Sequence, residues 1–352
     1  MNSMNITQKL EPAEHLALGV WLLVTGALNF ATNTLALLAF WRFPRLLCTP
    51  SAIPELAMFL SDLGVASLHP FSGFAALKNE WVWGFYGCQL YSFTGFFFGN
   101  FQCLCVPFVA YDRYVLACKP FEERSRYRTK GRYAKILLAL LVMTTFWGVM
   151  PLVGWASYSP TPPQVSCTID WTRSDVSYVS YMTSLCLLVF CAPLLVAAYN
   201  YWRVGVHVRE SRVHDIHWAA PGCVCLTALG CLLTTYVAFS GYGVLSLWPF
   251  VFDPRAIPKS LNMLPPPMAK LAGVLNPLFY LRLNPRLWSC ARRMLGLSFD
   301  REAMRVDKRE ETLYVDSPRS SSGRATPRDE SLPLEQKRRT ADDSGRVCEV
   351  DC

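Results

Sequence analysis

Long runs of apolar residues separated by short polar segments fill about the first three hundred positions of this 352-residue chain. Seven runs are long enough to cross a hydrocarbon layer as a helix, which takes about 20 residues. Five of them contain no charged side chain, namely residues 16–41, 84–111, 136–155, 176–202 and 218–252. Two others carry isolated charges, with Glu55 and Asp62 inside 52–77 and only Lys270 inside 261–280. The pattern predicts an all-α fold, a bundle of seven transmembrane helices in a lipid bilayer.

Composition supports a membrane protein over a soluble one. Hydrophobic residues make up 52% of the chain and charged residues only 17%, whereas soluble domains carry about 25% charged residues. Proline and glycine occur inside several runs, but a spanning backbone must be satisfied within a helix or a closed barrel, and barrel strands would be shorter and would alternate. The N-terminal residues lack the basic flank and short apolar core of a cleavable signal peptide, so the first run is expected to direct insertion.

Basic residues in the loops predict the orientation, because they gather on the cytoplasmic side. One side holds Arg42, Arg45, Lys119, Arg124, Arg126, Arg128, Lys130, Arg132, Lys135, Arg203, Arg209 and Arg212. The other side holds only Lys9, Lys78, Arg173, Arg255 and Lys259. We therefore expect a multi-pass protein of the plasma membrane with its N-terminus outside and its C-terminus inside. The net charge of +8 is mostly this bias, so no nucleic-acid surface is expected.

Three regions follow from the pattern. Residues 1–15 are expected to form an extracellular N-terminus, in which Asn5 opens a glycosylation sequon with Ile6 and Thr7. Residues 16–295 are expected to form the seven-helix domain with an amphipathic helix after the last span. Residues 296–352 are dominated by Arg, Glu, Asp, Ser and Pro, so they are expected to be a disordered cytoplasmic tail.

Lys270 is the most informative residue, because an ionisable group in the middle of a span costs about 3 kcal/mol or more. It lies ten residues before Tyr280, hence roughly 15 Å along the helix from the inner end of the span. Such a lysine could be held in a salt bridge or extend to the membrane surface. A desolvated primary amine is also a suitable nucleophile for an aldehyde. The residue by itself leaves these interpretations open.

The surrounding motif resembles the opsins, receptors of the rhodopsin-like class. An Ala-Lys pair stands seven residues before the proline of an Asn-Pro-x-x-Tyr motif, within residues 265–280. Further matches lie at 83–88, 95–99, 150–158, 166–171, Pro193, Tyr199, Tyr201 and 253–258. The resemblance covers nearly the whole membrane portion and looks most like the branch that contains peropsin, neuropsin and retinochrome-like proteins.

This resemblance implies a chromophore, retinal in its 11-cis or all-trans form, bound as a Schiff base to Lys270. It also implies that Tyr91, Gly95 and Gly99 line the pocket. The residues themselves suggest a covering disulfide between Cys88 and Cys167, because both lie on the expected outer, oxidising face, whereas most of the other cysteines lie within the spans.

The resemblance further implies a switch that engages a heterotrimeric G protein. Its expected residues are Asp112, Arg113, Tyr114, Asn276, Pro277 and Tyr280. Alone, an acidic-Arg-Tyr triplet at a helix end is an ordinary solvated terminus. Asp62, Asn33 and Asn276 are expected to form a water-holding polar network, which is either functional or purely structural, since buried polar groups need partners wherever they occur.

The segment after the seventh run alternates basic and apolar residues, which suits a short amphipathic eighth helix on the inner leaflet. Cys290 within it is a candidate for palmitoylation. Serines and a threonine between residues 317 and 326 are expected substrates of a receptor kinase, which would create an arrestin site, although Ser-rich disorder is also ordinary linker.

Three departures from the opsin pattern change the picture. Tyr91 and Thr161 stand where relatives carry the carboxylate that balances a protonated Schiff base, so the neutral linkage is expected to gain population. The sixth run reads Cys-Leu-Leu-Thr-Thr-Tyr at 231–236, without the usual Trp and Pro. The loop at about 203–217 is short and lacks a lysine cluster, which weakens the expectation of G-protein coupling.

Three functions remain open at this point. The first is a retinal photoreceptor, not an enzyme, that couples light to a G protein. The second is a photoisomerase of retinochrome type with weak or no signalling. The third is a receptor for a diffusible ligand, or a protein that has lost its chromophore. The sequence shows no pattern typical of a metal site, a nucleotide loop or a hydrolase triad.

Overall fold

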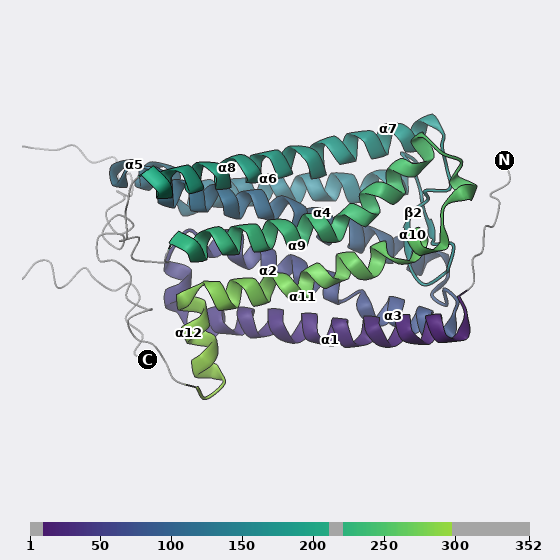
Figure 1. Cartoon of the computed structure of the whole chain (residues 1–352), viewed down its shortest axis with the longest axis horizontal. Helices are drawn as coiled ribbons and strands as arrows, with labels where there is room; N and C mark the ends of the chain where they lie inside the picture. The colour runs from purple at the N-terminus through teal and green to yellow at the C-terminus, as the bar shows by residue number, and fades with distance from the viewer. Residues whose placement is uncertain (1–9, 211–220, 298–352) are drawn as a thin grey trace, which may run out of the picture.

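The computed structural model describes residues 10–210 and 221–297, which fold as a bundle of seven helical passes (Figure 1). The first four passes are α1 (Pro12–Arg42), α2 (Ala52–Ala66) with α3 (His69–Lys78), α4 (Gly84–Cys118) and α6 (Lys130–Val149). The last three are α7 (Val176–Leu185) with η3 (Cys186–Cys191) and α8 (Ala192–Glu210), α9 (Pro221–Leu247), and α10 (Lys259–Met263) with α11 (Pro265–Leu283). The predicted seven-helix fold is confirmed.

Short elements join the passes. They are η1 (Pro44–Cys48), α5 (Phe121–Tyr127), η2 (Met150–Val153), β1 (Tyr158–Pro160), β2 (Cys167–Ile169), η4 (Trp248–Phe250), η5 (Pro254–Ala256) and α12 (Pro285–Met294). Strands β1 and β2 pair antiparallel in a two-stranded sheet at the end of the bundle where α1 begins, here called the hairpin end (Figure 1). Helix α12 turns away from α11 at the opposite end, here called the α12 end, and is the predicted amphipathic eighth helix (Figure 1).

Two of the expected spans are divided. Residues 52–77 form two helices in succession, α2 and α3, instead of one. Pro70 lies in the first turn of α3, and a proline there lacks the N–H that would continue the helix from α2. Likewise residues 261–280 begin in α10 and continue in α11, whose first turn contains prolines. Within the described residues, four helical stretches are long and apolar enough to cross a membrane: Pro12–Arg42, Gly84–Cys118, Glu123–Val153 and Val176–His207.

The fifth pass contains a π-helical turn, η3, between the α-helical segments α7 and α8. A π turn closes its hydrogen bonds at i→i+5 and so accommodates one more residue than an α-helical turn. Pro193 follows two residues after η3, and its missing N–H favours a break in the regular bonding of this turn. The pass extends to Glu210, beyond the expected limit at residue 202.

Helix α4 is the central element of the bundle, since it packs against α2, α6, α8 and α9. One apolar core lies towards the α12 end and includes Phe40, Phe59 and Leu287. A second lies towards the hairpin end around Trp147 and Tyr181. Many large apolar side chains are exposed on the outside of the bundle, which suits a protein whose surroundings are lipid instead of water.

Several predictions fall outside the described residues. They concern the Asn5 sequon, the tail beyond residue 297 and most of the loop that joins α8 to α9. They stay predictions.

Candidate functional site

A cavity of about 460 Å³ lies inside the bundle, between α4, α7, η3, α9 and α11. Its volume is within the range of sites that bind small molecules. Tyr91, Gly95 and Gly99, which the sequence predicts as pocket residues, lie along its α4 wall, and Lys270 lies in its α11 wall. Most other lining side chains are apolar, so the cavity suits an elongated apolar ligand with few polar groups.

Lys270 is buried, with 6% of its surface exposed. Its Nζ donates hydrogen bonds to Ser72 Oγ at 2.8 Å and to Tyr91 Oη at 3.0 Å. It also lies 5.7 Å from the centroid of the Tyr91 ring. These neutral partners hold the amine at the cavity wall without an ion pair. The salt-bridge interpretation that the sequence left open is therefore not supported among the described residues.

Ser72 and His69 are neighbours of Lys270 that sequence reasoning did not single out. Both belong to α3 and both are fully buried. His69 Nδ1 lies 3.1 Å from the Val65 carbonyl oxygen, and its Nε2 has no hydrogen-bond partner among the described residues. A histidine and a serine three residues apart share one helix face, so their spacing was a readable signal, but nothing in it pointed to a lysine almost two hundred positions later.

No Asp or Glu is among the described residues that line the cavity. Asp170 accepts hydrogen bonds from the backbone N–H and the hydroxyl of Thr172. Asp175 caps α7 by accepting from the Tyr178 N–H at 2.9 Å, and it forms an ion pair with Arg173. Partial burial opposes the charge of Asp175, but these bonds outweigh it and hold the pKa of Asp175 below its usual range. Both acids are engaged outside the cavity.

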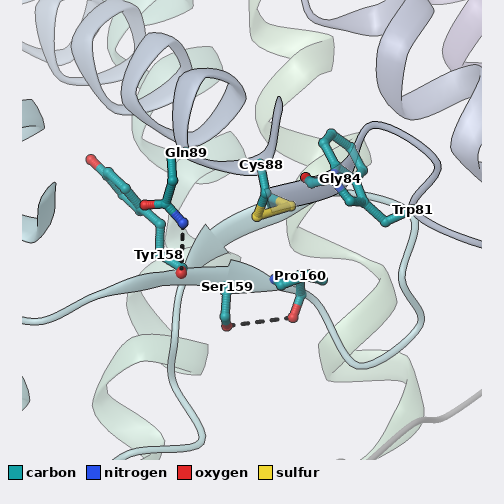
Figure 2. The surroundings of a disulfide bond; sticks show 8 residues. Trp81, Gly84, Cys88, Gln89, Tyr158, Ser159 and Pro160 are labelled. Atoms are coloured by element: carbon teal, nitrogen blue, oxygen red, sulfur yellow. Dashed lines mark hydrogen bonds between the residues drawn. A yellow bond between two sulfur atoms is a disulfide. The ribbon is translucent and has the colours of Figure 1, made fainter. Parts of the chain in front are cut away.

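A β-hairpin covers the cavity at the hairpin end. Cys88 at the start of α4 forms a disulfide with Cys167 in β2, with the two Cα atoms 5.4 Å apart, as the sequence predicts. Figure 2 shows β1 running beside this bond, where Gln89 donates to the Tyr158 carbonyl oxygen at 3.3 Å. Residues 167–169 of β2 line the cavity directly. Thr161, in the turn between the strands, is buried but does not line the cavity.

The predicted switch motif lies at the α12 end, where a buried network surrounds Asp112. Its carboxylate accepts hydrogen bonds from Ser51 Oγ at 2.7 Å, Tyr133 Oη at 2.8 Å and Arg128 Nε at 3.1 Å. Arg128 is itself almost wholly buried and donates also to Ser51 at 2.7 Å. The sequence assigned Arg128 only to a basic loop. The hydrogen bond from Arg128 to Asp112 instead ties the loop between α4 and α6 to the end of α4.

Arg113 is paired with a carboxylate that the sequence did not assign. Its Nη2 lies 2.5 Å from Glu55 Oε1, and Glu55 is 6% exposed. The same Glu55 oxygen accepts from Asn284 Nδ2 at 3.4 Å, at the start of α12. The acid therefore links α2, α4 and α12. A carboxylate inside an apolar run requires a partner, and that requirement was the signal by which Glu55 could have been found. Tyr114, the third residue of the motif, packs beside Ala117 and Val204.

Each residue expected in the polar network contacts other polar groups. Asn33 donates to the Gly273 carbonyl oxygen at 3.0 Å, which links α1 to α11. Asp62 accepts a hydrogen bond from Gln102 of α4. Asn276 accepts from Thr234 Oγ1 at 2.6 Å. These bonds involve polar side chains of five helices, α1, α2, α4, α9 and α11, in the interior of the bundle.

The remaining predicted residues lie near α11 and α12. Pro277 is inside α11, and Tyr280 is buried with its ring edge-on to Phe59 at 5.8 Å. Cys290 is wholly buried in the core cluster towards the α12 end. A palmitoyl group on this thiol would thus require α12 to move away from the bundle.

Comparisons with known proteins agree with this architecture. A family model described as 7 transmembrane receptor (rhodopsin family) matches residues 32–280. Visual pigment-like receptor peropsin of Homo sapiens is 30% identical over 280 residues, which cover 78% of this chain and 82% of that protein. Opsin-5 of Mus musculus is 30% identical over 302 residues, which cover 80% of this chain and 77% of that protein.

Among solved structures, the crystal structure of squid rhodopsin matches with a TM-score of 0.75 and covers 88% of this chain and 93% of that chain. Its sequence identity is 18%, so this match shows the fold alone. The family itself is shown by the family model and by the two relatives, each of which is 30% identical to this chain. The chain belongs to the rhodopsin family of seven-transmembrane receptors, and within that family it is an opsin.

Proposed function

We propose that this protein is a light receptor that binds retinal covalently through Lys270 and activates a heterotrimeric G protein. The observation that carries the proposal is the buried Lys270 amine in the wall of an apolar cavity, where its hydrogen-bond partners among the described residues are two hydroxyl groups. The relatives named as a visual pigment-like receptor and an opsin support it. We further propose that the hairpin end faces the outside of the plasma membrane and the α12 end faces the cytoplasm, as the basic loops predict.

The residues present fit retinal. The Lys270 amine would form the covalent bond, while Gly95 and Gly99 leave room along the α4 wall because they lack side chains. The disulfide-linked hairpin would cover the bound group and exclude water. When bound, retinal supplies light absorption and a change of isomer. Ser72 and Tyr91 would then orient the Lys270 nitrogen from the side of α3 and α4.

Signalling would pass to the α12 end, where Arg113 is held by Glu55 in the structure. Release of Arg113 from this buried pair would expose a cation between α2 and α4 for a G protein. Receptor kinase and arrestin are proposed partners of the C-terminal tail, which lies outside the described residues. This step is the part of the proposal that a photoisomerase would not need.

One observation favours the second candidate, a photoisomerase of retinochrome type. In α9, Thr234 and Thr235 stand where the usual motif has other residues, and both contact Asn276, at 2.6 and 3.5 Å. These bonds tie α9 to α11 and would resist an outward swing of α9. This arrangement favours weak or absent G-protein activation together with efficient light-driven change of the retinal isomer.

The covalent site is tested by reconstituting purified protein with 11-cis and with all-trans retinal and then reducing with borohydride. We expect retinyl label on the parent protein and on Lys259→Ala, a control that removes a half-exposed lysine paired with Glu14. Lys270→Ala should lose the label. Equal labelling of Lys270→Ala and the parent would refute the assignment. Extracting retinal after light and dark, together with nucleotide exchange on G protein, separates the receptor from the photoisomerase.

A further inference from the structure

One end of the cavity contains a polar side chain whose hydrogen-bonding groups are not all used. Asn100 of α4 lines the cavity, and its Nδ2 has no hydrogen-bond partner among the described residues. A buried amide nitrogen without a partner is unfavourable and rare in folded proteins, so it calls for an explanation. Towards Lys270 the α4 wall continues through Gly99, Phe96 and Gly95, which offer no polar side chain, to Ser92 and Tyr91 at the lysine end, where the Ser92 hydroxyl also has no partner among the described residues.

Asn100 lies far from the amine along the cavity. Tyr91, which contacts Lys270, precedes Asn100 by nine residues on α4. At a rise of 1.5 Å per residue this places Asn100 about 13.5 Å further along the helix. A ligand attached to Lys270 and extending past Gly95 and Gly99 therefore has its remote end near Asn100.

The neighbouring polar groups of this end do not satisfy Asn100. Cys103, Cys186 and Cys191 line the cavity there, and thiols are weak hydrogen-bonding groups. Cys186 and Cys191 contact each other, with their sulfur atoms 3.8 Å apart. The amide is left as the strongest hydrogen-bonding group that this part of the wall can offer to a ligand.

We propose that the natural ligand is a retinoid with a hydroxyl group on its ring, and that this hydroxyl bonds to the Asn100 amide. A hydroxyl both donates and accepts, so it complements the carboxamide whichever of its two polar atoms faces the ligand. An unsubstituted ring would leave the amide without a partner. This inference rests on the proposed attachment of a retinoid to Lys270 and adds the chemical class of that ligand.

The test is a competition between ligands of one isomer. The parent protein is incubated with an equimolar mixture of retinal and 4-hydroxyretinal, and in parallel with retinal and 3-hydroxyretinal, so that two positions of the hydroxyl on the ring are compared. Borohydride reduction then makes each adduct stable, and mass spectrometry of the Lys270 peptide gives the ratio of the two adducts. A mixture of retinal and a ring-methylated retinal controls for size.

We expect the parent to prefer at least one hydroxylated retinal by about three- to tenfold, the range expected for one neutral hydrogen bond. Asn100→Leu should lose this preference and still take up retinal. Thr94→Val should keep it, because the Thr94 hydroxyl bonds to the Leu90 carbonyl oxygen on the same helix and does not line the cavity. If Asn100→Leu does not fold, Asn100→Ala replaces it in the comparison.

Equal uptake of retinal and both hydroxylated forms by the parent would overturn this inference and leave the proposed function intact. The same holds if the ring-methylated retinal is preferred as strongly as the hydroxylated one, or if the Asn100 variants keep the full preference. Absence of any adduct on the parent would overturn both the proposed function and the inference that rests on it.

Discussion

Replacing Tyr91 by glutamate should convert the bound pigment from ultraviolet or violet absorption to visible absorption. The cavity wall holds no carboxylate among the described residues, so a positive charge on the linkage to Lys270 has no balancing anion there. A neutral linkage keeps its electrons localised and absorbs at short wavelength. We therefore expect the parent pigment, formed with 11-cis retinal, to absorb mainly in the ultraviolet or violet in the dark.

The size of the effect follows from the geometry. Tyr91 Oη lies 3.0 Å from Lys270 Nζ, and the shorter glutamate side chain would place its carboxylate somewhat further from the nitrogen. Two unit charges about 4 Å apart attract by about 4 kcal/mol at an effective dielectric constant of 20. One unit of pH corresponds to about 1.4 kcal/mol. After the cost of burying the new carboxylate, the midpoint of the spectral titration should rise by about two to three pH units.

The assay is a series of dark spectra from about pH 5 to pH 9. Tyr91→Gln is the matched control, since it has the shape of glutamate without the charge. Thr161→Glu tests the other expected carboxylate position, and it should act less strongly because Thr161 does not line the cavity. A parent peak in the visible throughout this range, with Tyr91→Glu and Tyr91→Gln titrating alike, would show that another anion balances the charge.

Three further outcomes are expected. Cys88→Ala should lower the free energy of unfolding by roughly 4–5 kcal/mol, because the disulfide closes a loop of 79 residues. Its thermal midpoint should fall below that of the control Cys48→Ala, and equal midpoints would contradict this. Glu55→Gln should raise basal nucleotide exchange on the G protein, because it removes the charge that pairs with Arg113. The control Glu123→Gln removes an exposed surface pair and should leave basal exchange unchanged. If only the control raised basal exchange, Glu55 would not restrain Arg113. Asp175→Ala should cost about 1 kcal/mol of stability at neutral pH through loss of the helix cap. Because the folded pKa of this aspartate is lowered, the difference should persist above about pH 4 and disappear as the pH falls through that lowered value, as chemical denaturation at several pH values would show.

The sequence predicted the features that depend on local pattern. Seven apolar runs indicated seven passes, because length and lack of charge suffice to mark a helix in lipid. Lys270 was recognised by its spacing to Asn276 and Tyr280, and the disulfide by the side of the membrane on which Cys88 and Cys167 lie. These predictions depend on short sequence segments or on the order of spans and loops, and both can be determined from a single sequence.

Features that depend on helix rotation and on long-range contact were not predictable in the same way. Glu55 and Arg113 lie 58 residues apart, and no pattern states which face of α2 turns towards α4. Ser72 reaches Lys270 across 198 residues. The division of residues 52–77 was also missed, although Pro70 was a visible warning of it.

The π turn at residues 186–191 has a consequence for insertions and deletions in this chain. Because a π turn holds one residue more than an α-helical turn, deleting one residue within it would restore the regular pitch while α7 and α8 keep their facing. A deletion within α8 before Ala197 removes no such extra residue and would rotate the rest of α8 by about 100°. Ala197 and Val204, which pack against α4, would then point elsewhere, while Met182 and Leu185 would keep their places in the cavity wall. The π turn is therefore the part of this pass at which the loss of one residue disturbs helix packing least.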